Sequence, residues 1–122
     1  MIRRVKFVSI PVKNQNTALE FYTKKLGFKI LTDQPFNDTQ RWIELEIPGA
    51  ETKVVLFTPE GHEDRVGGFL NLTFESDDIE TTYRIVQEKG VKIEEKLSKE
   101  HWGSMFVMKD SEGNSICVSE KR

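Results

Sequence analysis

The sequence has few of the residues from which disulfides, zinc sites and membrane spans are made. Cys117 is the single cysteine in 122 residues, so an internal disulfide and any site with two cysteine ligands are excluded. No apolar run approaches the roughly 20 residues of a transmembrane helix. The first residues, MIRRVKFVSIPV, are too charged for a cleavable signal. We therefore expect a cytoplasmic protein with no membrane partner.

The sequence also lacks an excess of charge of either sign. Eighteen basic and twenty acidic side chains are interspersed along the chain and give a formal net charge of -2. Proteins that bind nucleic acid usually carry a basic stripe or patch, so no nucleic-acid partner is expected. The hydrophobic content of 37%, with eight phenylalanines, is that of a globular protein, and the length suits a single domain spanning residues 1–122.

The first part of the chain, about residues 1–59, predicts one helix among four strands. Apolar side chains recur every three or four residues from Thr17 to Leu26, and Gly27 stands where a helix C-cap belongs. A polar stretch at residues 13–16 supplies turn and cap residues before this helix. Short apolar runs bounded by turn residues predict strands at 5–12, 28–31, 42–47 and 53–58.

The same order of elements restarts after a polar, glycine-containing linker at about residues 60–68. The elements predicted in this second part, about 69–122, are a strand at 69–76, a helix at 79–90, and strands at 91–94, 104–108 and 115–119. Aligning the two parts places Asn14 on Asp78 and Gly27 on Gly90. The alignment favours an internal repeat of a strand-helix-three-strand module, although two ordinary modules could match by their spacing alone. Either way the expected fold class is α+β.

Alternation along each predicted strand divides its side chains between two faces of a sheet. One face is apolar throughout and is expected to pack on the helices; it consists of Val8, Ile10, Val12, Ile43, Leu45, Ile47, Val55, Phe57, Leu70, Leu72, Phe74, Ile116 and Val118. The opposite face is mixed; it consists of Phe7, Ser9, Pro11, Trp42, Glu44, Glu46, Val54, Leu56, Thr58, Asn71, Thr73, Glu75, Ser115, Cys117 and Ser119. Such a mixture suits a small-molecule pocket, with a solvated face or a dimer interface as the alternatives.

Several segments, in order, resemble one family. The most specific are FYTKKLGF at 21–28, DDIE at 77–80 followed by KGV at 89–91, and WG with D-x-x-GN between 102 and 114. Their order and spacing resemble the glyoxalase, bleomycin-resistance and extradiol-dioxygenase superfamily, also called vicinal oxygen chelate proteins, over nearly the whole chain. The resemblance implies two βαβββ modules that form a cupped mixed sheet around one site, often completed by a homodimer.

Enzymes of that superfamily hold a divalent metal through His and Glu on the inward face of the first and last strand of each module. The positions that correspond here are Phe7, Leu56, Asn71 and Cys117. A Zn, Ni, Mn or Fe site needs at least three His, carboxylate or thiolate ligands, so this departure leads us to expect no metal, no other cofactor and no catalytic residue. The resemblance then favours the superfamily's drug-binding resistance proteins, which bind a small organic molecule in a metal-free groove.

The predicted ligand-binding residues are Phe7, Trp42, Glu44, Leu56, Asn71, Trp102 and Cys117. The two tryptophans begin comparable strands and would be stacking walls or core residues. The carboxylates of Glu44, Glu46 and Glu75 could hold a cationic ligand, act as a base, or form a solvated rim. His62 and His101 are expected at the surface, and Cys117 is expected to be an inert filler.

Two other functions stay open at this level. One is a glyoxalase-type lyase or a dioxygenase that recruits its metal through Glu44, Glu75 and Cys117, for which metal polarisation of the substrate would be needed. The other is an interaction module whose groove is filled by its dimer partner.

Overall fold

The computed structural model describes residues 1–121, which form two compact units. The division falls between Val66 and Gly67, inside the stretch 60–68 that the sequence marks as a linker. Each unit has its own sheet and its own helix, and each is described by itself below.

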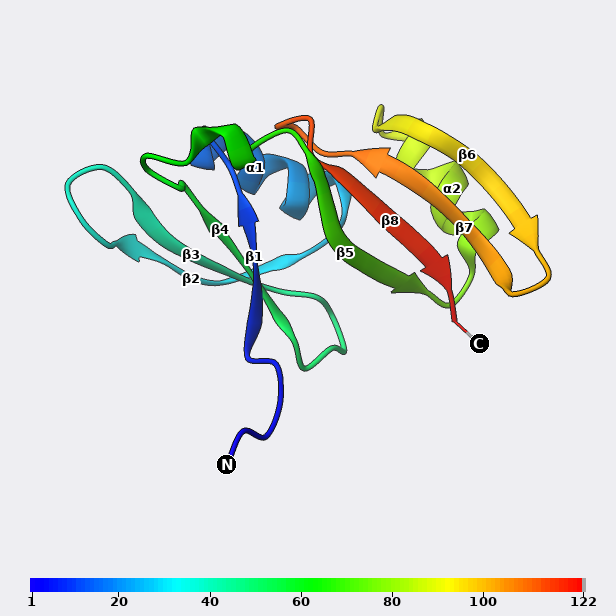
Figure 1. The fold of residues 1–122 in the computed structure, drawn as a ribbon, viewed down its shortest axis with the longest axis horizontal. Coiled ribbons are helices and arrows are strands. Elements are labelled where there is room, and N and C mark those ends of the chain that lie inside the picture. The colour runs from blue at the N-terminus through cyan, green and yellow to red at the C-terminus, as the bar shows by residue number, and fades with distance from the viewer. Residues whose placement is uncertain (122) are drawn as a thin grey trace. The chain divides into compact units, whose positions relative to one another are not determined.

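The first unit has the order strand, helix and three strands. Its elements are β1 (Phe7–Pro11), α1 (Gln15–Glu20), the π-helix η1 (Phe21–Lys25), β2 (Lys29–Pro35), β3 (Arg41–Glu46) and β4 (Lys53–Phe57), with the 3-10 helix η2 (Glu63–Arg65) after them. The strands form a four-stranded sheet in the order β1-β4-β3-β2, in which β1 and β4 are parallel and the other pairs antiparallel (Figure 1).

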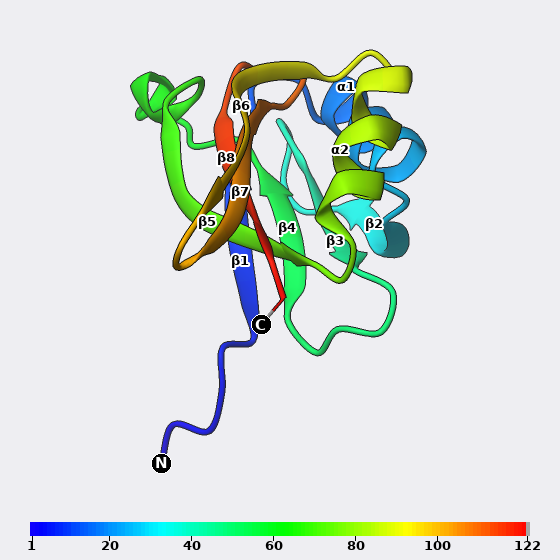
Figure 2. The ribbon, with the colours of Figure 1, turned by 90° about the vertical axis from the view of Figure 1, so that its right-hand side faces the viewer.

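The second unit repeats this order and topology. Its elements are β5 (Phe69–Ser76), α2 (Ile79–Glu88), β6 (Lys92–Glu100), β7 (Gly103–Lys109) and β8 (Ser115–Glu120). The sheet order is β5-β8-β7-β6, again with one parallel pair, β5 and β8. Figure 2 shows α2 along one side of these strands, and α2 contacts β6, β7 and β8. The predicted α+β fold with two βαβββ modules is confirmed.

Both helices begin with a side-chain cap, as the sequence indicates. Asn14 Oδ1 accepts a hydrogen bond from Thr17 N at 2.9 Å, and Asp78 Oδ1 accepts one from Thr81 N at 3.1 Å. These bonds satisfy a backbone donor that the first helical turn cannot. The first helix therefore begins at Gln15, two residues before the predicted start at Thr17.

The core of the first unit lies between its helix and one face of its sheet, which we call the helix face. Ile10 and Ile43 both stand opposite Leu56 in the strand registers, and all three side chains are fully buried. Facing partners in neighbouring strands project to the same side of a sheet, so Leu56 lies on the helix face. The other side of each sheet is the helix-free face.

The prediction of which β4 side chains lie on which face of the sheet was wrong: the two faces were exchanged. Val54 and Leu56 were expected on the helix-free face, but Val54 pairs with Leu45 and Leu56 with Ile43, which puts both on the helix face. Residues 54–57 read Val-Val-Leu-Phe, so alternation carries no signal in this strand and only its partners settle the face. Val55 and Phe57 take the helix-free side instead.

The edge strands β2 and β6 both extend well beyond their predicted ends. β2 extends to Pro35 where a loop was expected from residue 33, and β6 extends to Glu100 where the prediction ended at 94. The sequence of β6, KIEEKLSKE, is mostly charged, which is how edge strands avoid pairing with other chains. One face of an edge strand needs no apolar pattern, so sequence periodicity underestimates its length.

Candidate functional site

Three aromatic rings gather on the helix-free side of the first sheet. Trp42 lies edge-on to Phe7, with ring centroids 5.7 Å apart and an interplanar angle of 78°. Its other neighbour is Phe36, at 5.8 Å and 41°. Phe7 and Trp42 are half-buried, whereas Phe36 is 62% exposed. Such ring pairs hold one another in place beyond what area burial alone provides, so their remaining surface is presented in a fixed orientation.

A carboxylate lies beside this aromatic cluster of Phe7, Phe36 and Trp42. Trp42 Nε1 donates to Glu44 Oε1 at 3.3 Å, and Glu44 is half-buried. The two residues are separated by one position in β3, so both project from the helix-free face. Three of the predicted ligand-binding residues, Phe7, Trp42 and Glu44, are thus brought together within one unit.

Phe36 is the member of the cluster that the sequence prediction missed. It was assigned to the loop at 33–39 and follows directly on Pro35, the last residue of β2. A single aromatic side chain in a polar segment is the only sequence signal that could have pointed to it.

Leu56 does not belong to this face. Its side chain is 0% exposed and lies on the helix face, so the residues of β4 on the helix-free side are Val55, which is 1% exposed, and half-buried Phe57. Neither Val55 nor Phe57 has a donor atom for a metal.

The predicted residues of the second unit lie on or next to the helix-free face of the second sheet. Cys117 pairs with Thr73 and Val107 in the strand registers and is half-buried, with a free thiol. Asn71 is exposed in β5, in phase with exposed Thr73. Trp102 is 41% exposed in the turn between β6 and β7, just before the strand rather than within it as Trp42 is.

Potential metal ligands are dispersed. Within residues 1–121 no group of three or more His, Cys, Asp and Glu side chains is placed to hold a metal ion. His62 and His101 are both exposed, as predicted. The same residues contain no helix of the length and apolarity that a membrane crossing requires.

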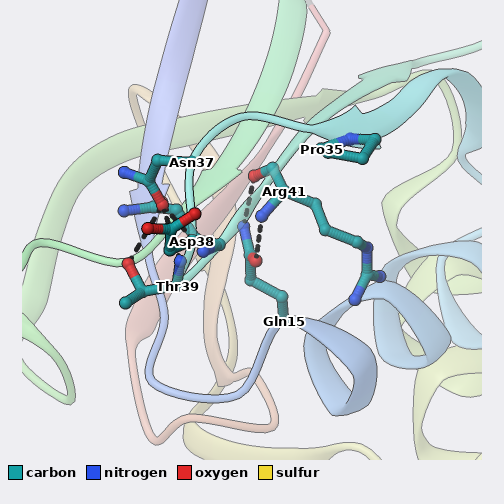
Figure 3. Close-up of a pocket in the computed structure, with 7 residues that line it drawn as sticks. Gln15, Pro35, Asn37, Asp38, Thr39 and Arg41 are labelled. Atoms are coloured by element: carbon teal, nitrogen blue, oxygen red, sulfur yellow. Dashed lines mark hydrogen bonds between the residues drawn. The ribbon is translucent and has the colours of Figure 1, made fainter.

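An open pocket of about 250 Å³ lies where β3 and β4 diverge, and it is lined by Gln15, Pro35, Asn37, Asp38, Thr39, Gln40 and Arg41 (Figure 3). Gln15 is 8% exposed, and its side-chain amide forms hydrogen bonds through both its nitrogen and its oxygen. Its Nε2 donates to the carbonyl oxygens of Arg41 at 2.8 Å and Leu56 at 3.0 Å. Its Oε1 accepts from Arg41 N at 3.0 Å. Gln40 does the same for Thr58, accepting from its N–H at 3.0 Å and donating to its carbonyl at 3.1 Å.

These two glutamines replace the strand pairing that the sheet lacks at this end. The pairing of β3 with β4 stops at Ile43 and Leu56, and beyond these residues the side-chain amides bond backbone groups that a ladder would otherwise satisfy. The sequence analysis singled out neither glutamine. Their partners lie 18 to 41 residues away, so no local pattern reveals them.

The guanidinium group of Arg41, which lines the pocket, is also engaged within the fold. Arg41 Nε donates to Asp33 Oδ1 and Nη1 to Asn16 Oδ1, both at 2.8 Å. Asn37 Oδ1 accepts from the N–H groups of Thr39 and Gln40, each at 2.9 Å, which closes the turn. The pocket is therefore a polar junction that holds α1 to the β2–β3 hairpin.

The D-x-x-GN segment of the second unit is a buried polar turn. Asp110 Oδ1 accepts from the N–H groups of Glu112 and Asn114, both at 2.9 Å, and Asp110 Oδ2 accepts from Asn114 Nδ2 at 3.0 Å. Asn114 is fully buried, and its Oδ1 accepts from Gly67 N at 2.7 Å. Gly67 has φ of +91°, and a Cβ there would contact Glu112 O at 3.5 Å. This motif fixes the start of the second unit through hydrogen bonds within the fold.

Beside that turn, Lys109 Nζ lies 3.1 Å from Glu94 Oε1 and 3.4 Å from Ser115 Oγ. The hydroxyl of Ser115 and the ammonium of Lys109 lower the pKa of Glu94. The Ser115 side chain is buried, with 4% exposure, so this network is structural.

Comparison with known proteins agrees with this architecture. Residues 4–118 match the family model described as the glyoxalase/bleomycin resistance protein/dioxygenase superfamily. The chain belongs to this superfamily. A curated relative of similar length is protein YetH of Bacillus subtilis, which is 30% identical over 120 residues, or 98% of this chain and 100% of YetH.

Solved structures of superfamily members share the fold. TnmS3, an antibiotic-binding protein from Streptomyces sp. CB03234, is 29% identical, with a TM-score of 0.85 over 99% of this chain and 98% of TnmS3. A superfamily member from Sphaerobacter thermophilus, also 29% identical, has a TM-score of 0.89 over 98% of both chains.

Proposed function

We propose that this protein binds a small organic molecule without a metal, and that the ligand lies against the aromatic cluster of Phe7, Phe36 and Trp42. The observation that carries the proposal is the arrangement of the three rings: an indole held by two phenyl rings on a sheet face that no helix of its unit covers. Flat, rigid rings favour ligands with a planar apolar part, because stacking orders few rotatable bonds.

Similarity to TnmS3 supports the same class of function, since TnmS3 is an antibiotic-binding protein of this fold. We propose that residues 1–122 act as one domain and that Asn71, Trp102 and Cys117 are further ligand contacts. The homodimer and the cytoplasmic location are likewise proposals, carried by the superfamily resemblance and by the composition.

The experiment is a calorimetric titration of the purified protein with planar three-ring aromatic compounds. Trp42→Ala is expected to weaken binding about tenfold or more, since it removes the central stacking surface. The matched control is Ile85→Ala, which removes an apolar side chain that is 37% exposed on α2 of the second unit and is not part of the cluster. Equal affinities for Trp42→Ala and wild type would contradict the proposal.

The lyase or dioxygenase alternative predicts a different measurement. An enzyme of that kind needs its metal to polarise substrate oxygen atoms. We expect protein purified without chelator to contain far less than one equivalent of Fe, Ni, Mn or Zn, by elemental analysis, and its melting temperature to be unchanged by these metals. A near-stoichiometric metal content would favour the enzyme.

A further inference from the structure

The inference concerns Glu44, and it rests on the proposed function. Its carboxylate is half-buried and receives one hydrogen bond, from the indole N–H of Trp42. Among residues 1–66, no lysine or arginine forms an ion pair with it; Lys24 pairs with Glu20, and Arg41 pairs with Asp33. A charge that has lost part of its water without gaining a counter-charge is unfavourable.

The cross-strand neighbours explain why Glu44 is not compensated. Its register partners are Thr32 on β2 and Val55 on β4, and neither carries a charge. Glu46, two residues along the same strand and on the same face, stands opposite Lys29. The two carboxylates therefore differ in their surroundings: Glu46 stands opposite a lysine of its own unit, and Glu44 lies beside the indole of Trp42.

We propose that the ligand is a planar aromatic cation, with its positive charge at Glu44 and its ring system on the aromatic cluster. Both features favour the same sign of charge. The carboxylate supplies a charge-assisted hydrogen bond or ion pair, and the faces of the three rings carry negative potential that attracts cations. An anionic ring system would be repelled by both.

The test compares three ring systems of equal size: proflavine as the cation, 9-anthracenemethanol as the uncharged probe and anthracene-2-sulfonate as the anion. The expected order of affinity for the wild-type chain, by fluorescence titration, is cation, neutral, anion. Glu44→Gln keeps an acceptor for the indole N–H and removes the charge. It is expected to weaken proflavine binding about tenfold and to change binding of the neutral probe less than about twofold.

Glu46→Gln is the matched control, since it removes the same charge from the same face and strand. It should change the affinity for proflavine less than about twofold, because Glu46 stands opposite Lys29 and does not contact Trp42 as Glu44 does. A second readout needs no variant: raising the salt concentration should weaken proflavine binding to the wild type and leave the neutral probe unaffected.

The outcomes separate the two proposals. Equal affinities for cation and anion, or a Glu44→Gln variant that binds proflavine like wild type, would overturn the charge assignment while Trp42→Ala still weakens all three probes. If none of the probes binds, the proposed function fails and this inference fails with it.

Discussion

The two units share one order of elements and one sheet topology, yet they stabilise equivalent positions in different ways. The helix start is the clearest case. Gln15 follows the Asn14 cap in the first unit, and Ile79 follows the Asp78 cap in the second. Ile79 is 2% exposed and simply packs, whereas Gln15 is buried at 8% and bonds the backbone of two strands. In the first unit, the buried polar residue Gln15 lies where the pairing between β3 and β4 ends.

At the turn before the last strand, the second unit rather than the first uses buried polar side chains. In the second unit this turn contains the buried Asp110 and Asn114, whose side chains bond one another and the backbone. In the first unit it is closed by a backbone bond, Ala50 N to Ile47 O at 2.9 Å. These two polar networks therefore lie at different places in the repeated module, at the helix start in the first unit and before the last strand in the second.

The helix-free faces show a third difference, and it concerns function. The first unit presents aromatic rings and Glu44, while the second presents mainly small polar side chains such as Thr73, Ser119 and Cys117. Stacking and charge recognition are therefore expected from the first unit. The second unit offers hydroxyl, amide and thiol groups that can orient a ligand but contribute less binding energy.

The largest effect is expected from Asn114→Ala. The substitution leaves Gly67 N without its acceptor and removes a donor from the buried carboxylate of Asp110, so it should lower the free energy of unfolding by about 2–4 kcal/mol. Pro48→Ala in the corresponding turn of the first unit is the control and should cost less than about 1 kcal/mol, because that turn is closed through its backbone. Urea denaturation measures both, and similar losses would remove the distinction between the two turns.

A smaller effect is expected from Gln15→Ile, which gives the first unit the residue found at the second unit's helix start. The apolar side chain can fill the space, but it cannot bond Arg41 or Leu56, so the free energy of unfolding should fall by about 1–2 kcal/mol. Hydrogen exchange provides a local readout, because the amide of Arg41 loses its acceptor and should exchange faster. Unchanged exchange at Arg41 would mean that the glutamine does not replace the missing ladder.

The sequence predicted features that depend on neighbouring residues and missed features that depend on strand pairing. Element order and the cap residues before the first helix were predicted correctly, because each depends on residues within a few positions of one another. The face of β4 was not, since four consecutive apolar residues have no alternation and the partners on β1 and β3 decide. The predicted length of the charged strand β6 was too short for a related reason. Its pairing with β7 continues through residues that show no hydrophobic alternation.

The candidate site was predictable in part for the same physical reason. Phe7, Trp42 and Glu44 could be assigned to one face from alternation alone. Phe36 could not, because its contact with Trp42 depends on how the β2–β3 hairpin closes. Leu56 was assigned to the wrong face together with the rest of its strand.

The smallest effect is expected at the helix caps, where the two units differ in charge. The cap of α2 is Asp78, whose bonds from Thr81 N–H, and then from the Thr81 hydroxyl, lower its pKa below the ordinary 3.8. A carboxyl group with a lowered pKa stabilises the folded state above its unfolded pKa, and this contribution is lost as the pH falls through the folded value. The cap of α1 is the neutral Asn14, which has no such dependence.

Exchanging the caps tests this difference directly. Asp78→Asn should be less stable than wild type at pH 7, and the deficit should disappear as the pH is lowered from about 4 toward 2, because the wild-type carboxylate becomes protonated there. Asn14→Asp should show the reverse, with a gain at pH 7 from the helix dipole and the charge-assisted cap that vanishes in acid. Urea midpoints at the two pH values measure both variants. A deficit of Asp78→Asn that is equal at pH 7 and in acid would show that the cap acts through its shape alone, and the two units would then be equivalent at this position.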